Sequence, residues 1–207
     1  MTEETELNGT TVIEADQLEA AVDAIARGEL VVYPTETVYG LGANALDEDA
    51  VRRVFAAKER DRSKPLSMAV ESVSAVEEYV PVTDQEREFM QEFLPGPVTV
   101  VVSASEEIPS ELLGGRERVG IRVPDNEIAL KLLSRTPPLT ATSANISGAE
   151  SARSIPELDE EIRADAAIVI DGGRTPGGGS TVVDVEREQV HRRGPLSDQI
   201  TEWLATQ

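Results

Sequence analysis

The sequence predicts an α/β fold in which helices flank a twisted sheet of mixed parallel and antiparallel strands. Short β-branched runs alternate irregularly with amphipathic helix patterns, and some runs are separated only by short turns. A regular doubly wound sheet fits this order less well. The chain has 207 residues, 40% of them hydrophobic, which is enough for the core of one domain. No repeat, low-complexity tract or linker divides it.

Helix and strand signals alternate through the first third of the chain. Asp16 lies at the capping position of a first helix, and Gly28 lies just past its end. The apolar run at 30–33 predicts a short buried strand. The glycine-rich stretch at 34–42 is predicted as a turn, and the apolar spacing at 47–58 predicts a second helix that begins at its aspartate. The chain therefore begins with helix, strand and helix.

The same signals continue to the end of the chain. We expect further strands at 66–70, 98–103, 119–123, 139–142, 167–170, 181–185 and 189–192. We expect further helices at 73–79, 84–93, 126–134, 156–163 and 196–204.

The composition excludes several classes of protein. The absence of cysteine removes disulfides, thiolate catalysis and cysteine metal sites. No apolar run is long enough to span a membrane, and the first ten residues lack the apolar core of a secretory signal. We therefore expect a soluble, cytoplasmic protein.

The charge is strongly acidic, with 39 acidic against 19 basic residues and a net charge of -20. This indicates either a salt-adapted protein or a basic partner, and the scarcity of lysine and of aromatic residues favours a halophilic cytoplasm. Most of such a surface would repel nucleic acid, so direct RNA binding is expected to be weak or absent.

The few lysines and arginines cluster at one point of the chain. Lys58, Arg60, Arg62 and Lys64 lie within one heptad, at the end of the second predicted helix. In an acidic chain this cluster favours an anion-binding site. The alternative is a solvated helix end whose cations complement the helix macrodipole.

Two polar loops are further candidates. Gly173 to Ser180 has the glycine spacing of a P-loop, but Gly179 replaces the lysine and a strand follows, so a Walker A site is excluded. This loop is a mobile cover over a ligand or a simple surface turn. The stretch from Ser143 to Gly148 follows a strand, where α/β sheets place ligands. The single histidine, His191, is not accompanied by a nucleophile-elbow motif, so the sequence does not indicate a Ser-His-Asp hydrolase.

Several short motifs occur in a fixed order: Tyr33 to Gly42, Lys58-Glu59-Arg60, Pro65-Leu66-Ser67, Leu94 to Thr99, Val119 to Pro124 and Ser143-Ala144-Asn145. In this order they resemble the YrdC-domain family of threonylcarbamoyl-AMP synthases, over roughly residues 12–194. We accordingly expect a YrdC-like domain at 12–194, an N-terminal extension at 1–11, and a C-terminal helix at 195–207 that packs on the same domain. The chain resembles the short form of the family, without the extra C-terminal domain of longer members.

The resemblance implies a twisted α/β fold around a concave, positively charged cavity. It implies synthesis of threonylcarbamoyl-AMP and pyrophosphate from L-threonine, bicarbonate and ATP, with Mg²⁺ accompanying ATP. The adenylate would pass to a separate transferase complex that modifies tRNA. Such chemistry needs positioning and charge neutralisation but no side-chain nucleophile, which suits a chain without cysteine.

The resemblance also assigns site residues, with Lys58 and Arg60 as the catalytic pair. The nucleotide would be bound by Lys58, Arg60, Arg62, Arg118, Ser143, Asn145, Ser151 and Arg192. Threonine would be bound by Thr35, Ser67, Arg122, Ala141 and Ser180, with Arg122 on its carboxylate. No protein ligand for a metal is assigned.

The chain departs from the family pattern in two places. Asp61 stands after Arg60, where relatives often have proline soon after the arginine, and the stretch Ser67 to Ala69 lacks a histidine seen in many relatives. Two alternatives stay open: a non-catalytic nucleotide- or RNA-binding module of the same fold, and a carbamoyl-adenylate domain that serves another acceptor.

Overall fold

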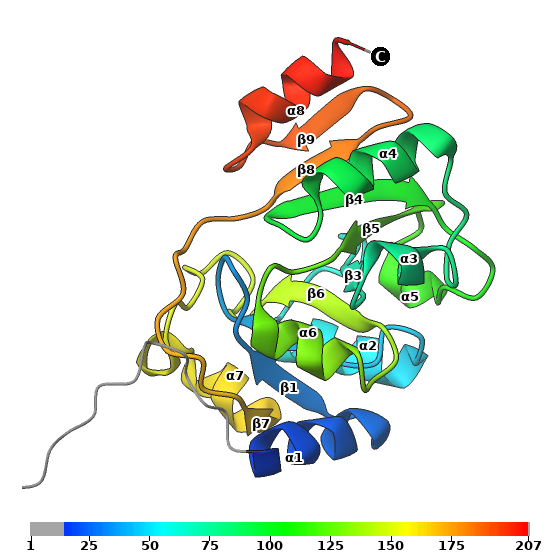
Figure 1. The fold of residues 1–207 in the computed structure, drawn as a ribbon. Coiled ribbons are helices and arrows are strands. Elements are labelled where there is room, and N and C mark those ends of the chain that lie inside the picture. The colour runs from blue at the N-terminus through cyan, green and yellow to red at the C-terminus, as the bar shows by residue number, and fades with distance from the viewer. Residues whose placement is uncertain (1–14, 207) are drawn as a thin grey trace, which may run out of the picture.

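The fold is a nine-stranded mixed sheet flanked by helices, as predicted (Figure 1). A computed structural model describes residues 15–206 of the chain. The strand order is β7-β1-β2-β6-β3-β5-β4-β8-β9. Three of the pairs, β1 with β7, β3 with β5 and β4 with β8, are parallel, and the others are antiparallel. Within residues 15–206 no helix is long and apolar enough to cross a membrane.

The elements lie close to their predicted positions. The strands are β1 Leu30–Tyr33, β2 Gly40–Gly42, β3 Ser67–Ala69, β4 Val98–Ser103, β5 Arg118–Arg122, β6 Leu139–Ser143, β7 Ala166–Val169, β8 Thr181–Asp184 and β9 Gln189–Arg192. The helices are α1 Ala15–Ala26, α2 Glu48–Ala57, α3 Val73–Val76, α4 Asp84–Phe93, α5 Ser110–Leu113, α6 Glu127–Leu133, α7 Glu160–Asp165 and α8 Ser197–Leu204, with a 3₁₀ turn at Ile155–Glu157.

The helix caps agree with the sequence at most positions. Asp47, Ser72 and Asn126 accept hydrogen bonds from the first backbone N–H groups of α2, α3 and α6, and Thr83 forms a capping box with Glu86 at α4. The prediction for the first cap is wrong. Asp16 lies inside the first turn of α1, because Ala15 is already helical.

The largest error concerns Gly40–Gly42, which we predicted as part of a turn. These residues form β2, which pairs antiparallel with both β1 and β6. Their glycines are required by packing, because the ring of Tyr33 lies over them. A Cβ at Gly42 would lie 2.8 Å from a carbon of that ring, and one at Gly40 would lie 3.2 Å from it. Glycine at these positions lets the ring of Tyr33 pack closely against the strand and does not mark a turn.

Smaller differences concern short helices. The predicted helix at 156–163 is divided into the 3₁₀ turn and α7, because Leu158 has an extended backbone. The third helix stops at Val76, earlier than predicted. Helix α5 was not predicted, because its single turn is too short to show a hydrophobic period.

Two core clusters pack on opposite faces of the sheet. Along β1, Leu30 and Val32 belong to the larger cluster, whereas Val31 and Tyr33 belong to the smaller one. The smaller cluster packs under α1 and α6, which cover only one end of their face. The rest of that face is left open for the site described below.

The chain between β7 and β8 links distant parts of the sheet. β7 is one edge strand, whereas β8 lies next to the other edge. Figure 1 shows this segment, residues 170–180, running along the side of the molecule from one end to the other. We call it the connecting strap.

Candidate functional site

A large cavity of about 990 Å³ lies on the face of the sheet that α1 and α6 leave open. Residues two apart on a strand share a face, so Arg118, Gly120 and Arg122 of β5 all point into it. The register of the neighbouring strands adds Ser67, Thr99, Ala141 and Ser143 to the same face. The strap adds the backbone from Pro176 to Ser180.

Cationic side chains dominate the ionisable groups of the cavity. Its lining contains seven arginines and three carboxylates, which are Arg60, Arg116, Arg118, Arg122, Arg153, Arg187, Arg192, Glu117, Glu150 and Asp184. Burial lowers the pKa of Arg60. Burial, and then the nearby charge of Arg122, lower the pKa of Arg192. Two guanidinium groups thus approach one another inside the cavity, an arrangement that an anionic ligand would stabilise.

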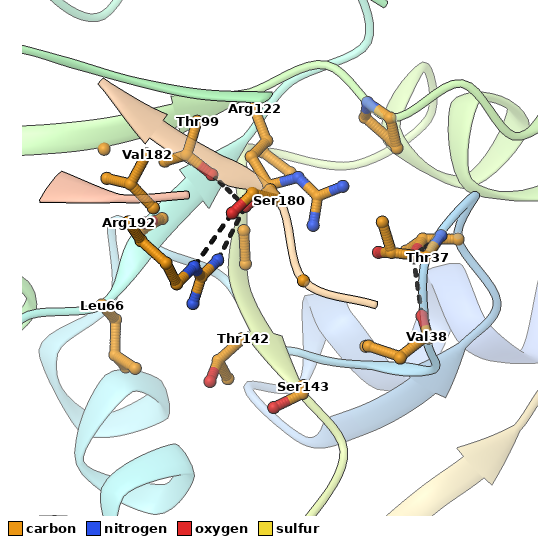
Figure 2. Close-up of a pocket in the computed structure, with 18 of the residues that line it drawn as sticks. Thr37, Val38, Leu66, Thr99, Arg122, Thr142, Ser143, Ser180, Val182 and Arg192 are labelled. Atoms are coloured by element: carbon orange, nitrogen blue, oxygen red, sulfur yellow. Dashed lines mark hydrogen bonds between the residues drawn. The ribbon is translucent and has the colours of Figure 1, made fainter. Parts of the chain in front are cut away.

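Arg192 is fixed by hydrogen bonds at one wall of the cavity. Its Nε donates to the backbone oxygen of Ser180 at 2.9 Å, and its Nη2 donates to Ser180 Oγ at 2.8 Å. Ser180 Oγ also lies 2.7 Å from Thr99 Oγ1. Figure 2 shows this chain of contacts from β9 through the strap to β4. The position of Arg192 is therefore set before any ligand binds.

Arg122 is paired with a carboxylate that the sequence analysis did not identify. Its Nη2 donates to Oε1 of Glu36, which lies on the loop between β1 and β2. The side chains of Arg122 and Glu36 are 14% and 11% exposed. Arg122 Nε and Glu36 Oε2 are buried without a hydrogen-bond partner among the described residues. The guanidinium thus keeps a donor for a further acceptor, such as a ligand carboxylate.

Arg60 lies at the other wall, where the chain leaves α2. Its guanidinium donates to the carbonyls of Lys64 and Pro65, at 3.1 Å and 3.0 Å. Glu59, just before it, has a positive φ of 48°, so the chain turns sharply after the helix. This turn brings Arg60 into the cavity, whereas Arg62 is exposed and does not line it.

Lys58 and Asn145 lie behind the cavity wall rather than in it. Lys58 is 2% exposed, and its Nζ donates to the carbonyls of Ser143 and Asn145. Asn145 Nδ2 donates to the carbonyls of Ile146 and Ala149. Both side chains therefore hold the loop that follows β6.

That loop presents hydroxyl groups to the cavity. Ser143 and Ser151 both line it. Ser151 Oγ is tied back to Asn145 Oδ1 at 3.3 Å, and the backbone N–H of Ile146 donates to Asp159 at 2.8 Å. The loop is thus held in shape by buried contacts at its base.

Arg118 is engaged by several carboxylates. Its Nε lies 3.0 Å from Oδ2 of Asp184, its Nη2 lies 3.4 Å from Glu86, and its Nη1 donates to Glu186. Asp184 is fully buried. A nucleotide phosphate would have to compete with these groups for Arg118.

The strap is fastened on both sides of the cavity. Gly177 N donates to the carbonyl of Thr37 at 2.7 Å, and Thr175 N donates to the carbonyl of Arg153 at 2.8 Å. The hydroxyl of Tyr39 donates to the carbonyl of Gly173 at 2.8 Å. The strap therefore lies against the cavity and is not a simple surface turn, while its movement over a ligand stays a prediction.

Most residues assigned by resemblance meet in this cavity. Those that line it are Thr35, Arg60, Ser67, Arg118, Arg122, Ala141, Ser143, Ser151, Ser180 and Arg192. Three assigned residues, Lys58, Arg62 and Asn145, do not line it. The cavity is also lined by residues that were not predicted, among them Tyr33, Thr37, Tyr39, Thr99, Gly120 and Arg153. Strand alternation could have found Gly120, which lies between two assigned arginines.

The described residues offer no metal centre of their own. Within residues 15–206, no group of three or more His, Asp or Glu side chains is placed to hold a metal ion. A divalent cation that enters with a nucleotide can be coordinated mainly by the phosphates. The carboxylate of Glu150, next to Ser151 in the lining, is available to such an ion.

The fold and the cavity define an α/β protein with a pocket of arginines and hydroxyl groups across one sheet face. Comparison with known proteins identifies the family. The model for the Sua5, YciO and YrdC proteins, described as "Telomere recombination", matches residues 23–194. The chain belongs to this family.

Two relatives indicate how far the similarity extends. A Pyrococcus abyssi protein named threonylcarbamoyl-AMP synthase is 43% identical over 176 residues, which are 84% of this chain and 52% of the relative. A Methanocaldococcus jannaschii protein is 38% identical over 84% of this chain and 82% of its own length. The chain thus spans about half of the first relative and most of the second.

Solved structures agree with the sequence comparison. P. abyssi Sua5 in complex with L-threonine has a TM-score of 0.86 at 40% identity, covering 93% of this chain and 58% of that one. Escherichia coli YciO has a TM-score of 0.78 at 27% identity, covering 89% of this chain and 92% of that one.

Proposed function

We propose that this protein is a threonylcarbamoyl-AMP synthase. The observation that carries the proposal is that residues assigned to the nucleotide and residues assigned to threonine line one continuous cavity. The relative named threonylcarbamoyl-AMP synthase and the Sua5 structure with L-threonine support the same activity.

The proposed reaction has two steps that balance. The amino group of L-threonine and bicarbonate form a carbamate with loss of water. A carbamate oxygen then attacks the α-phosphorus of ATP, the bond to the β-phosphate breaks, and pyrophosphate leaves. The protein contributes positioning and neutralisation of charge. Arg60 and Arg192 would neutralise the phosphates, while Arg122 would hold the threonine carboxylate.

We further propose that Mg²⁺ enters with ATP, that the product passes to a separate tRNA-modifying transferase, and that the protein works in the cytoplasm. Direct binding of tRNA would be weak, given the net charge of -20. Lys58 and Asn145 would act on the nucleotide through the loop that they hold. Arg118 and Arg62 stay in the proposal as secondary nucleotide contacts.

Pyrophosphate release tests the proposal directly. The full chain would be incubated in potassium chloride with ATP, Mg²⁺, bicarbonate and labelled threonine. Threonine-dependent pyrophosphate and a threonylcarbamoyl adenylate are expected. Arg60→Ala and Arg192→Ala should each lower the rate about a hundredfold. Arg27→Ala, which removes an exposed arginine paired with Glu29 at the end of α1, is the control.

The outcomes separate the alternatives. Nucleotide binding without an adenylate product would favour the non-catalytic module instead. Product formed from another carbamoyl acceptor, but not from threonine, would favour a different carbamoyl-adenylate enzyme.

A further inference from the structure

Tyr33 lines the cavity with a hydroxyl group that forms no hydrogen bond with another described residue. The residue is 2% exposed and lines the cavity. Among residues 15–206, no side chain or backbone group forms a hydrogen bond with this hydroxyl. The hydroxyl is not among the buried atoms that lack a partner, so it is reached from the cavity and is free to form a hydrogen bond with a ligand.

The direction of the hydroxyl follows from the packing of the ring. Ring carbons Cδ1 and Cε1 lie against Gly42, whereas Cζ and Oη lie against Gly40. Gly40 lines the cavity, and Gly42 does not. The hydroxyl end of the ring therefore lies on the cavity side, and the flank of the ring is held in the smaller core cluster.

The surroundings of this hydroxyl combine polar and apolar groups. Arg122 and Glu36 are close enough to influence its ionisation, although burial is the main cause that raises the pKa of Tyr33 to about 12. The phenol thus stays protonated near neutral pH and can both donate and accept. The methyl groups of Ala69 and Ala141 line the cavity on the same sheet face.

Two of the hydroxyl groups that line the cavity are already engaged. Thr35 Oγ1 donates to the carbonyl of Val38 at 2.7 Å and lies 2.9 Å from Thr37 Oγ1. Ser180 Oγ is held between Arg192 and Thr99. Tyr33 is therefore a free donor and acceptor beside the arginine that we assign to the substrate carboxylate.

We propose that the Tyr33 hydroxyl binds the side-chain hydroxyl of the amino-acid substrate and so selects threonine over amino acids of the same shape without that hydroxyl. This inference rests on the proposed function. A carboxylate would be satisfied by the two-pronged guanidinium of Arg122, whereas a neutral hydroxyl matches a neutral phenol that donates and accepts. The alanine methyl groups leave an apolar surface for the substrate methyl group.

Tyr33→Phe tests the proposal, because it removes the hydroxyl and keeps the ring that packs on β2. For the wild type and the variant, kcat/KM for adenylate formation and the dissociation constant by calorimetry would be measured with L-threonine, L-serine, L-valine and L-2-aminobutyrate. With threonine and serine, kcat/KM should fall and the dissociation constant should rise, each roughly tenfold, which is the effect of one neutral hydrogen bond. With valine and aminobutyrate, both quantities should stay unchanged. Tyr79→Phe, which removes a phenolic hydroxyl outside the cavity, should leave all four unchanged.

Other outcomes would overturn the proposal. An equal loss for all four amino acids would place the hydroxyl on the shared backbone groups of the substrate. No loss for any of them would mean that it meets no substrate. If the wild type itself formed no adenylate and bound none of the four, the proposed function would fail first, and this inference with it.

Discussion

Lys58 is a buried lysine whose ammonium group is held by carbonyl oxygens instead of a carboxylate. Its Nζ lies 2.6 Å from the carbonyl of Asn145 and also donates to that of Ser143. Burial, with a smaller contribution from Arg60, lowers the pKa of Lys58 to about 8, and Asp159 opposes this shift. Lys58 is therefore charged at neutral pH but close to losing its proton.

This pKa makes nucleotide binding sensitive to pH. If Lys58 supports the phosphate side of the cavity, its charge is present below a pH of about 8 and is lost above it. Binding of Mg-ATP to the wild type should then weaken as the pH rises from about 7 to about 9.5. Lys58→Met should bind more weakly at pH 7 and show little change over this range. Calorimetric titration at several pH values measures both.

Two results would contradict this role. The affinity of the wild type could stay constant across the range, or Lys58→Met could keep the same pH dependence as the wild type. A thermal unfolding curve for the variant at each pH is the control, because the loop after β6 depends on Lys58.

Site residues that bind a ligand through their own charge could be predicted from the sequence. Residues whose role depends on their neighbours in the fold could be predicted only in part. Arg60, Arg122 and Arg192 were assigned by the family resemblance, and all three reach the cavity. The roles of Tyr33 and Glu36 depend on which face of β1 is open and on which arginine lies opposite. Such non-local facts are absent from the local pattern of the chain.

Side chains along β5 alternate between the two faces of the sheet, and those on one face form the floor of the cavity. Arg118 and Arg122 point into the cavity, and Gly120 lies between them on the same face. A Cβ at Gly120 would lie 2.5 Å from Ser67 Oγ and 2.8 Å from Thr99 Cγ2. The glycine thus keeps the floor open between β3 and β4.

Gly120→Ala should therefore fill the floor of the cavity. We expect a loss of about 1–3 kcal/mol in the free energy of unfolding, because the neighbours must shift, together with weaker threonine binding. Urea unfolding and calorimetry measure the two effects. Gly179→Ala is the control for stability, because its new Cβ would meet Arg192 at an ordinary 3.6 Å. Equal stability of the two variants would contradict the packing argument.

The β8–β9 hairpin is attached to the sheet by a buried ion pair. Asp184 ends β8 with its side chain 1% exposed, and it contacts Arg118 of β5, whose side chain is 11% exposed. Glu186, beyond the end of the strand, contacts the same arginine but is 53% exposed. The two carboxylates share a partner and differ in burial.

Their burial predicts unequal effects on stability. Asp184→Ala should cost about 3 kcal/mol or more, since it leaves a buried arginine poorly compensated. Glu186→Ala should cost less than about 1 kcal/mol, as exposed pairs do. Chemical denaturation of both variants measures the difference. Similar losses would mean that Arg118 is held mainly by Glu86, which also lies near it.

Helices were predicted well because their signals are local. The cap at Asp47, where the second helix was predicted to begin, needs only its neighbours in the sequence to be recognised. β2 was missed because its three residues contain two glycines, and only the ring of Tyr33 across the sheet explains them. Strand register and partner choice come from such distant contacts, which a single sequence does not display.

The molecule as a whole combines an acidic surface with a cavity rich in arginine. The net charge is -20, yet the cavity lining contains seven arginines and three carboxylates. The excess of acidic residues must therefore lie outside the cavity. Such a distribution keeps a protein soluble in concentrated salt while it retains a local site for anions.

This imbalance predicts that salt stabilises the fold. Raising potassium chloride from about 0.1 M to about 1 M shortens the Debye length from roughly 10 Å to roughly 3 Å and screens both attraction and repulsion. The exposed ion pairs that salt weakens contribute little each, whereas the excess of 20 negative charges repels throughout the surface. The repulsion should dominate, so the midpoint of thermal unfolding of the full chain should rise with salt. The rise should largely disappear near a pH of about 4, where many carboxylates are protonated. A midpoint that is constant or falls with salt at neutral pH would mean that favourable ion pairs outweigh the repulsion, and that the acidity serves a basic partner instead.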